Sequence, residues 1–238
     1  MQKIIVLNPK GGSGKTTLAT NLASHFAVLG LRPTLMDMDP QGSSMRWLKK
    51  RQSDQPVIHG VAGYERNPRV TRTFAMRIPR GCERVIVDTA AALDAQRLPE
   101  TTRNSNAILV PVLPSDIDLH AAAKCISNLL LIAKIHRSEQ RIGVVANRVK
   151  KNTVSFKSLM RFLETLRIPV VAVLRDSQSY IRSAECGQGL FEMKPNTVQE
   201  DLETWEPLLA WLARRGELPE TGSTLPPTPA PPDLQRMA

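Results

Sequence analysis

The chain has 238 residues, of which 42% are hydrophobic but only 4% aromatic. This composition predicts one large domain with a mainly aliphatic core, followed at most by a tail. The net charge of +10 favours a polyanionic partner. No apolar run approaches the ~20 residues that a membrane-spanning helix needs. The first residues already form an apolar strand pattern in place of a signal peptide, so we expect a cytoplasmic protein.

The three cysteines argue against one class of metal protein. Cys82, Cys125 and Cys186 lie far apart and form no Cys-x-x-Cys pair. A zinc site or an iron–sulfur cluster is therefore not expected. We interpret all three as structural thiols of a reducing compartment.

A glycine-rich stretch at residues 9–17 lies between an apolar run at 4–7 and helical spacing at 18–27. A strand, a glycine loop and a helix in this order form a phosphate-binding cradle, because backbone N–H groups and the helix N-terminus face the anion. A turn that binds nothing is disfavoured, since strand, loop and helix all agree. We expect Lys15 to reach the β- and γ-phosphates and the Thr16 hydroxyl to bind Mg²⁺. The predicted nucleotide-binding residues of the loop are Gly11, Gly12, Ser13, Gly14, Lys15, Thr16 and Thr17.

Acidic residues end two further predicted strands. The run at 33–39 ends in Asp37 and Asp39, and the run at 84–88 ends in Asp88. Ligands of open α/β sheets bind at the carboxyl ends of parallel strands, so these acids and the glycine loop should share one edge. We expect Asp88 to hold Mg²⁺ through water. Alone, each acid could equally cap a turn; the phosphate loop favours the functional interpretation.

The loop departs from the standard P-loop in two places. Pro9 replaces the first glycine, and Lys10 adds a second lysine. The sequence Lys-Gly-Gly-x-Gly-Lys-Thr-Thr resembles the deviant Walker A loop of the ParA/MinD family of ATPases. Asp-x-Asp-Pro-Gln-Gly at 37–42 resembles the switch segment of ParA proteins. Asp88-Thr89-Ala90 resembles the family's Asp-Thr-Pro, with alanine replacing proline.

This resemblance implies a role for each of these residues. Lys10 reaches across a dimer interface to the partner's ATP, and Asp39 positions or activates the attacking water. Asp37 supports the magnesium shell. The predicted catalytic residues are Lys10, Lys15 and Asp39. The predicted metal residues are Thr16, Asp37 and Asp88.

The remaining elements follow in chain order. A basic, irregular region at 43–84 is expected to contain helices at 43–51 and 67–76 and a short strand at 56–61. Beyond it we expect strands at 107–111, 142–148 and 169–174 and helices at 119–136, 154–166 and 197–215, the last of which Pro207 could break or restart. Pro-Ser-x-x-Asp-Leu at 114–119 is common in the family before a long helix. Ser115 as an N-cap with Asp118 explains this segment, so we leave it outside the site.

Two strand ends are candidates for binding the base. Asn147 matches the position where the family uses asparagine to contact adenine, although a turn-forming asparagine explains it equally well. Arg175 and Asp176 resemble the family segment that packs over the base.

Basic residues dominate between 141 and 182, and without a recognition helix they favour non-specific DNA. A solvated basic surface is the alternative. The candidate DNA contacts are Arg148, Lys150, Lys151, Lys157 and Arg161.

Taken together, residues 1–215 are predicted to form a doubly wound α/β P-loop domain with a mainly parallel sheet and helices on both faces. Residues 216–238 are rich in proline, which predicts a disordered tail and argues against the basic amphipathic end of MinD-type proteins.

The resemblance implies an ATP hydrolase with ATP and Mg²⁺. It forms an ATP-sandwich homodimer, binds nucleoid DNA, and is stimulated by a ParB-like or other cargo adaptor. The cargo is a plasmid, a chromosome or a protein organelle such as a carboxysome. The alternative is a MinD-like regulator on a membrane. A cluster-bridging reductase and a synthetase are disfavoured, because the paired cysteines and a second catalytic domain are missing.

Overall fold

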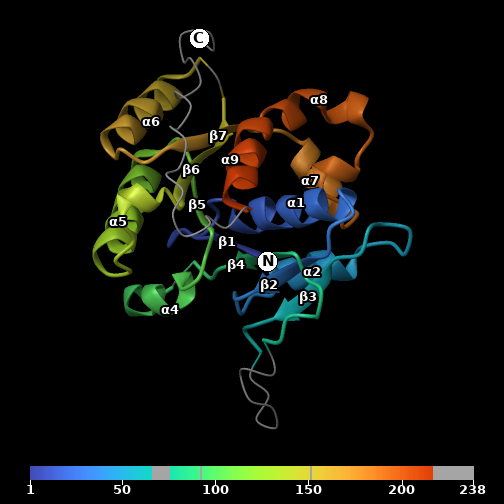
Figure 1. Cartoon of the computed structure of the whole chain (residues 1–238). Coiled ribbons are helices and arrows are strands. Elements are labelled where there is room, and N and C mark those ends of the chain that lie inside the picture. Colours follow the sequence, from blue (N-terminus) through green and yellow to red (C-terminus); the bar gives the residue numbers. More distant parts are fainter. Residues whose placement is uncertain (66–75, 92, 151, 217–238) are drawn as a thin grey trace.

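A computed structural model describes residues 1–65, 76–91, 93–150 and 152–216 (Figure 1). The helix expected at 67–76 and the proline-rich tail therefore lie almost wholly outside the described residues, as does Lys151. Among the described residues, no helix is both long and apolar enough to cross a bilayer.

The described strands form one seven-stranded sheet in the order β3-β2-β4-β1-β5-β6-β7, and every pair of neighbours is parallel. β1 lies at the centre of the sheet, so the loop that follows it has strand ends on both sides. The strands are β1 (Gln2–Val6), β2 (Pro33–Asp37), β3 (His59–Ala62), β4 (Arg84–Asp88), β5 (Ala107–Val112), β6 (Ile142–Val149) and β7 (Val170–Arg175).

Helices cover both faces of the sheet, so the chain has two cores (Figure 1). Alternate residues of β1 show the division: Ile4 belongs to one core and Ile5 to the other, and both are fully buried. Each such side chain stabilises the fold by about 1.5–3 kcal/mol. One face carries α1 (Lys15–Val28), α2 (Ser43–Lys49), α7 (Ser179–Glu185), α8 (Pro195–Glu203) and α9 (Glu206–Gly216). The other carries α4 (Leu98–Thr102), α5 (Asp116–Leu131) and α6 (Val154–Thr165). The doubly wound fold is confirmed.

The expected N-caps of two helices are confirmed, but one helix length is wrong. Ser115 accepts a hydrogen bond from the Asp118 N–H, and Thr153 accepts one from the Phe156 N–H. The helix expected at 119–136 begins earlier and ends at Leu131.

The closing helix expected at 197–215 is two helices, α8 and α9. Pro207 lies in the first turn of α9, where its missing N–H is tolerated. Trp205 stands between the helices and is fully buried. Together with Leu208, Trp211 and Leu212 it packs into the core beneath α1, so this apolar face is already covered.

Candidate functional site

The phosphate loop joins β1 to α1, and its shape requires glycine. Gly12 and Gly14 have φ values of 76° and 94°, which L-residues rarely adopt. A Cβ on Gly14 would lie 2.1 Å from Nδ2 of Asn147. Alanine at position 14 would therefore displace either the loop or the end of β6.

Two buried asparagines fix the loop to the neighbouring strands. Asn8 donates from Nδ2 to the Pro111 carbonyl at the end of β5 (2.6 Å), and its Oδ1 accepts from the Lys10 N–H (2.8 Å). Asn147, near the end of β6, donates from Nδ2 to the Ser13 carbonyl of the loop (2.9 Å). Asn8 was not predicted as a site residue, although a polar residue directly after a buried strand is a sign of a role at the sheet edge. The loop is therefore shaped before any ligand binds.

Lys15 begins α1 with its side chain turned into the loop. It is 7% exposed, and its Nζ donates to the Lys10 carbonyl (3.0 Å). Burial lowers the pKa of Lys15, while the negative charges of Asp88 and Asp39 act to raise it. The ammonium thus lies inside the loop, with a backbone carbonyl as its partner.

Asp88 ends β4 beside the first turn of α1, as predicted. Its Oδ2 accepts from the Thr16 hydroxyl and from the Ser44 hydroxyl, both at 2.7 Å, whereas the buried Oδ1 has no hydrogen-bond partner. Burial raises the pKa of Asp88 to about 6. An unpartnered buried carboxylate oxygen is costly unless a cation or a proton joins it. Ser44 was not predicted; its place soon after the switch acids was the available signal.

Asp37 lies opposite Asp88 in the β2–β4 register and is fully buried. Its two oxygens accept from the backbone N–H groups of Asp39 (3.0 Å) and Met45 (3.2 Å). Burial raises its pKa, and these hydrogen bonds act in the opposite direction. Asp37 therefore shapes the segment that carries Asp39. The half-buried Asp39 accepts from the Gln41 N–H (3.0 Å) in a tight turn.

These residues fit Mg²⁺ bound together with a nucleotide. The described residues contain no cluster of three or more His, Cys, Asp or Glu side chains placed to hold a metal. They do bring together two carboxylates and the Thr16 and Ser44 hydroxyls, and the free oxygen is on Asp88. Mg²⁺ commonly uses one or two carboxylates and takes its other ligands from phosphates and water.

Lys10 contacts a residue that the sequence analysis placed outside the site. Its Nζ lies 3.1 Å from Oδ2 of Asp118, which is 3% exposed. The Ser115 hydroxyl also donates to this Asp118 oxygen. β5 lies next to β1 in the sheet, so the start of α5 comes beside the loop. The sequence pattern did not predict that adjacency.

The residues predicted to bind the base all have partners inside the protein. Asn147 uses Nδ2 for Ser13, and its Oδ1 accepts from the Arg148 N–H (3.0 Å). Arg175 pairs with Glu200 and Asp201 of α8. Their roles toward the base stay predictions.

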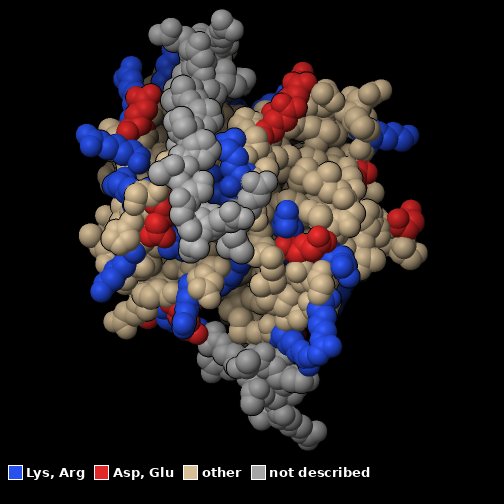
Figure 2. All heavy atoms as spheres, viewed as in Figure 1, with Lys and Arg blue, Asp and Glu red and all other residues tan. Residues whose placement is uncertain are grey.

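The predicted DNA contacts lie near the ends of β6 and α6. Arg148 and Lys150 are 61% and 74% exposed and pair with Asp176 at 3.3 and 3.9 Å. Lys157 and Arg161 are exposed on α6. Figure 2 shows Lys and Arg side chains over the part of this face where Figure 1 places α5 and α6. DNA binding by these residues stays a prediction.

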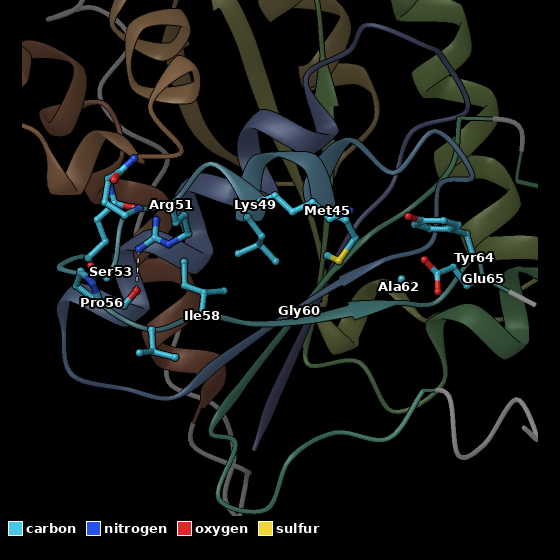
Figure 3. Close-up of a pocket in the computed structure, with 14 residues that line it drawn as sticks. Met45, Lys49, Arg51, Ser53, Pro56, Ile58, Gly60, Ala62, Tyr64 and Glu65 are labelled. Carbon is cyan, nitrogen blue, oxygen red and sulfur yellow. Dashed lines mark hydrogen bonds between the residues drawn. The ribbon is translucent and has the colours of Figure 1, made fainter. Parts of the chain in front are cut away.

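Of two cavities formed by described residues near the site, one adjoins the phosphate loop and the other does not. A cavity of about 450 Å³ between α2 and the edge strand β3 is lined by Met45, Ile58 and Tyr64 among others, and it does not touch the loop (Figure 3). A second cavity, of about 390 Å³, lies between α1, α2 and α7. Thr16 and Thr17 line it from the α1 side and Tyr180 from the α7 side.

Comparisons with known proteins agree with this geometry. The sequence profile of the CobQ/CobB/MinD/ParA nucleotide binding domain matches residues 4–191. The chain belongs to this family. Within it, the chain is 31% identical over 204 residues to the Maintenance of carboxysome distribution protein A of Gloeobacter kilaueensis, covering 83% of this chain and 87% of that protein. The protein of the same name from Halothiobacillus neapolitanus is 27% identical over 185 residues, covering 76% of this chain and 82% of that protein.

Solved structures of CobQ/CobB/MinD/ParA proteins share the fold at low sequence identity. A putative plasmid partition protein from Borrelia burgdorferi B31 bound to AMPPNP aligns with a TM-score of 0.68 at 15% identity, over 88% of this chain and 99% of that one. MinD in the MinC:MinD complex of Aquifex aeolicus aligns with a TM-score of 0.64 at 14% identity, over 96% and 99%. The predicted family and the predicted P-loop fold are therefore confirmed.

Proposed function

We propose that this protein is a ParA-like ATPase that positions a cargo by binding DNA as an ATP-bound homodimer. The observation that carries the proposal is the arrangement of Lys15, Thr16 and Asp88 around one phosphate loop, with a buried oxygen of Asp88 left without a partner. A cation would satisfy the free oxygen of Asp88, and an anion would pair with the buried ammonium of Lys15. ATP with Mg²⁺ supplies both.

Each residue has a defined task in hydrolysis. The loop N–H groups and Lys15 bind the phosphates and stabilise the charge that develops on them. Thr16, Asp37 and Asp88 would hold Mg²⁺, which would neutralise charge on the phosphates. Asp39 accepts a hydrogen bond from the attacking water and orients it. Lys10 leaves Asp118 and reaches the ATP of the partner subunit, so hydrolysis requires the dimer.

The names of the relatives support the proposed cargo, and the net charge supports DNA as the surface on which the protein acts. Two relatives that align with most of this chain are named for carboxysome distribution, so we propose a protein organelle as cargo, linked by an adaptor that stimulates hydrolysis. The net charge of +10 favours non-specific DNA as the surface that holds the ATP dimer, with nucleoid association as the result.

A MinD-like membrane role is less well supported. The apolar face of α9, which a membrane-binding helix would present to lipid, is packed against the sheet: Leu208 is 0% and Trp211 4% exposed.

Co-sedimentation separates the two surfaces. The protein with ATP and Mg²⁺ is mixed either with plasmid DNA or with vesicles containing anionic lipid. We expect DNA binding with ATP that is lost with ADP and weakens steeply with salt. The Lys10→Ala variant is expected to lose adaptor-stimulated hydrolysis. Vesicle binding without DNA binding would overturn the proposal in favour of the membrane role.

A further inference from the structure

The turn between β7 and α7 lies on the side of the phosphate loop opposite the metal-site acids. β5, β6 and β7 stand on one side of β1, and β4 and β2, which carry Asp88 and Asp37, stand on the other. The Asp176 N–H donates to the Val149 carbonyl (3.1 Å), which joins this turn to the end of β6. β6 in turn contacts the loop through Asn147 and Ser13.

One carboxylate on α8 fixes both ends of this turn. Asp201 is 3% exposed, and its Oδ2 accepts from the Ser177 hydroxyl at 2.7 Å. Its Oδ1 lies 3.3 Å from Nε of Arg175, the last residue of β7; this contact is an ion pair, and Oδ1 accepts no hydrogen bond. The Ser177 oxygen also accepts from the Ser179 N–H (3.2 Å), where α7 begins. A buried charge with these partners holds the turn in one conformation.

A second contact ties α7 to the junction of α8 and α9. The indole N–H of the fully buried Trp205 donates to the Tyr180 hydroxyl at 2.9 Å. Tyr180 lines the cavity of about 390 Å³ that also contains Thr16 and Thr17 of α1. The C-terminal helices thus position one wall of the hollow beside the phosphate loop.

If the phosphates lie at Lys15 and Thr16 and the metal lies on the Asp88 side, the side of the loop formed by β6, β7 and α7 is left for the ribose and base. We propose that Asp201 is a positioning residue for nucleotide binding: it holds the β7–α7 turn as part of the wall that receives the ribose and base. This inference rests on the proposed ATP binding. It assigns a nucleotide-site role to α8, which no phosphate-loop motif includes.

A purely structural role for Asp201 makes a different prediction. If Asp201 only attached α8 to the domain, its loss would affect all ligands of the phosphate loop alike, through general destabilisation. A positioning role affects only ligands that possess a nucleoside. Inorganic tripolyphosphate carries the phosphate groups of ATP without the nucleoside, so the pair of ligands separates the two roles.

The test measures the Kd of Mg²⁺–ATP and of Mg²⁺–tripolyphosphate by calorimetry for the full chain and for Asp201→Asn. We expect ATP binding to weaken about 10-fold or more, the scale of one lost charged hydrogen bond, and tripolyphosphate binding to change less than about 2-fold. The matched control is Glu200→Gln: its carboxylate also pairs with Arg175, but it is 77% exposed. We expect little change in either Kd there.

Each remaining outcome is decisive. Equal weakening for both ligands, or unchanged ATP binding by Asp201→Asn, overturns the positioning role. If Asp201→Asn does not fold, Ser177→Ala removes the hydrogen bond between Ser177 and Asp201 and should show the same selective loss on a smaller scale; equal loss for both ligands overturns the proposal there too. Failure of the unsubstituted chain to bind ATP overturns the proposed function itself, which is a separate result.

Discussion

The two sides of the phosphate loop differ in how far their polar groups are satisfied within the protein. On the β2–β4 side, the buried Asp88 keeps one oxygen without a partner and shares the other between two hydroxyls. On the β6–β7 side, Asn147 and Arg175 already have partners in the loop and in α8. The β2–β4 side can therefore accept a cation, whereas the side chains of the β6–β7 side hold the loop and the end of β7 in place.

This difference indicates whether ligand binding or folding itself stabilises each side. The unpartnered oxygen of Asp88 raises the free energy of the folded protein. A bound cation would remove this penalty, so cation binding should stabilise the β2–β4 side. On the β6–β7 side, Oδ1 of Asp201 also accepts no hydrogen bond, but the charge of Asp201 is paired with Arg175, so this side needs no added cation. Substitutions on the first side should therefore change chemistry, and those on the second should change affinity or stability.

The largest effect is expected for Asp88→Asn. Loss of the carboxylate should lower ATP hydrolysis by roughly 10³-fold, because charge neutralisation at the phosphates is lost. The ligand-free variant should nevertheless be more stable than the unsubstituted protein. The pKa of about 6 in the folded state lies above the ordinary 3.8. The charged carboxyl therefore costs up to about 3 kcal/mol above pH 6.

Denaturant unfolding at pH 8 with a chelator measures that stability. The difference in unfolding free energy between Asp88→Asn and the unsubstituted chain should vanish below about pH 4. There the Asp88 carboxyl is protonated in both the folded and the unfolded state. A variant that is less stable at pH 8 would mean that Asp88 is not an uncompensated charge.

The next effect concerns the connection between the two sides. Arg51, which follows α2, makes an ion pair with Glu192 near α7, and the two side chains are 8% and 4% exposed. Arg51→Ala leaves Glu192 buried without its partner, which should lower the free energy of unfolding by about 3–5 kcal/mol. Urea unfolding checks this. The double variant with Glu192→Met should recover most of the loss; no recovery would contradict a buried-charge origin.

The Asn147→Ala variant sharpens the comparison on the base side. The lost bond to the Ser13 carbonyl loosens the loop, so ATP and tripolyphosphate should both bind about 10-fold more weakly. Calorimetry with the two ligands reports this directly. A loss confined to ATP would instead assign Asn147 to adenine, as the sequence resemblance implies.

The smallest effect lies at the far end of α1, away from both sides. His25 packs against Phe26 and Phe191, and burial lowers its pKa from 6.5 to about 4. Its contribution to stability is full above pH 6.5 and is lost as pH falls toward 4. With partial exposure considered, the loss between pH 7.5 and 5 should be about 1 kcal/mol. His25→Phe should lack this part of the pH dependence; an identical pH profile would contradict it.

The sequence predicted the placement of the acids beside the phosphate loop well and the contacts on the β6–β7 side poorly, for a physical reason. Lys15, Asp37 and Asp88 directly follow apolar strands, and parallel strands bring their carboxyl ends to one edge. Asp118 and Asp201 act through neighbours that only the order of the sheet and the packing of α8 create. No spacing in the chain encodes those contacts.

The errors in the predicted elements have similar causes. The closing helix divides in two just before Pro207, the residue at which a break was considered, and Trp205 is buried between its halves. The long helix after Ser115 ends at Leu131, and Lys134 then adopts a left-handed conformation with φ 54°. The residues near Leu131 contain no comparable signal for the end of that helix.

The most direct test of the proposed ATPase is steady-state release of phosphate from ATP with Mg²⁺ and DNA, comparing the unsubstituted chain with Lys15→Ala. We predict slow, Mg²⁺-dependent hydrolysis by the former and a loss of about 100-fold or more in the latter, since Lys15 is the buried cation of the phosphate loop. Hydrolysis at the same rate by Lys15→Ala would contradict the assignment of this loop as the catalytic site.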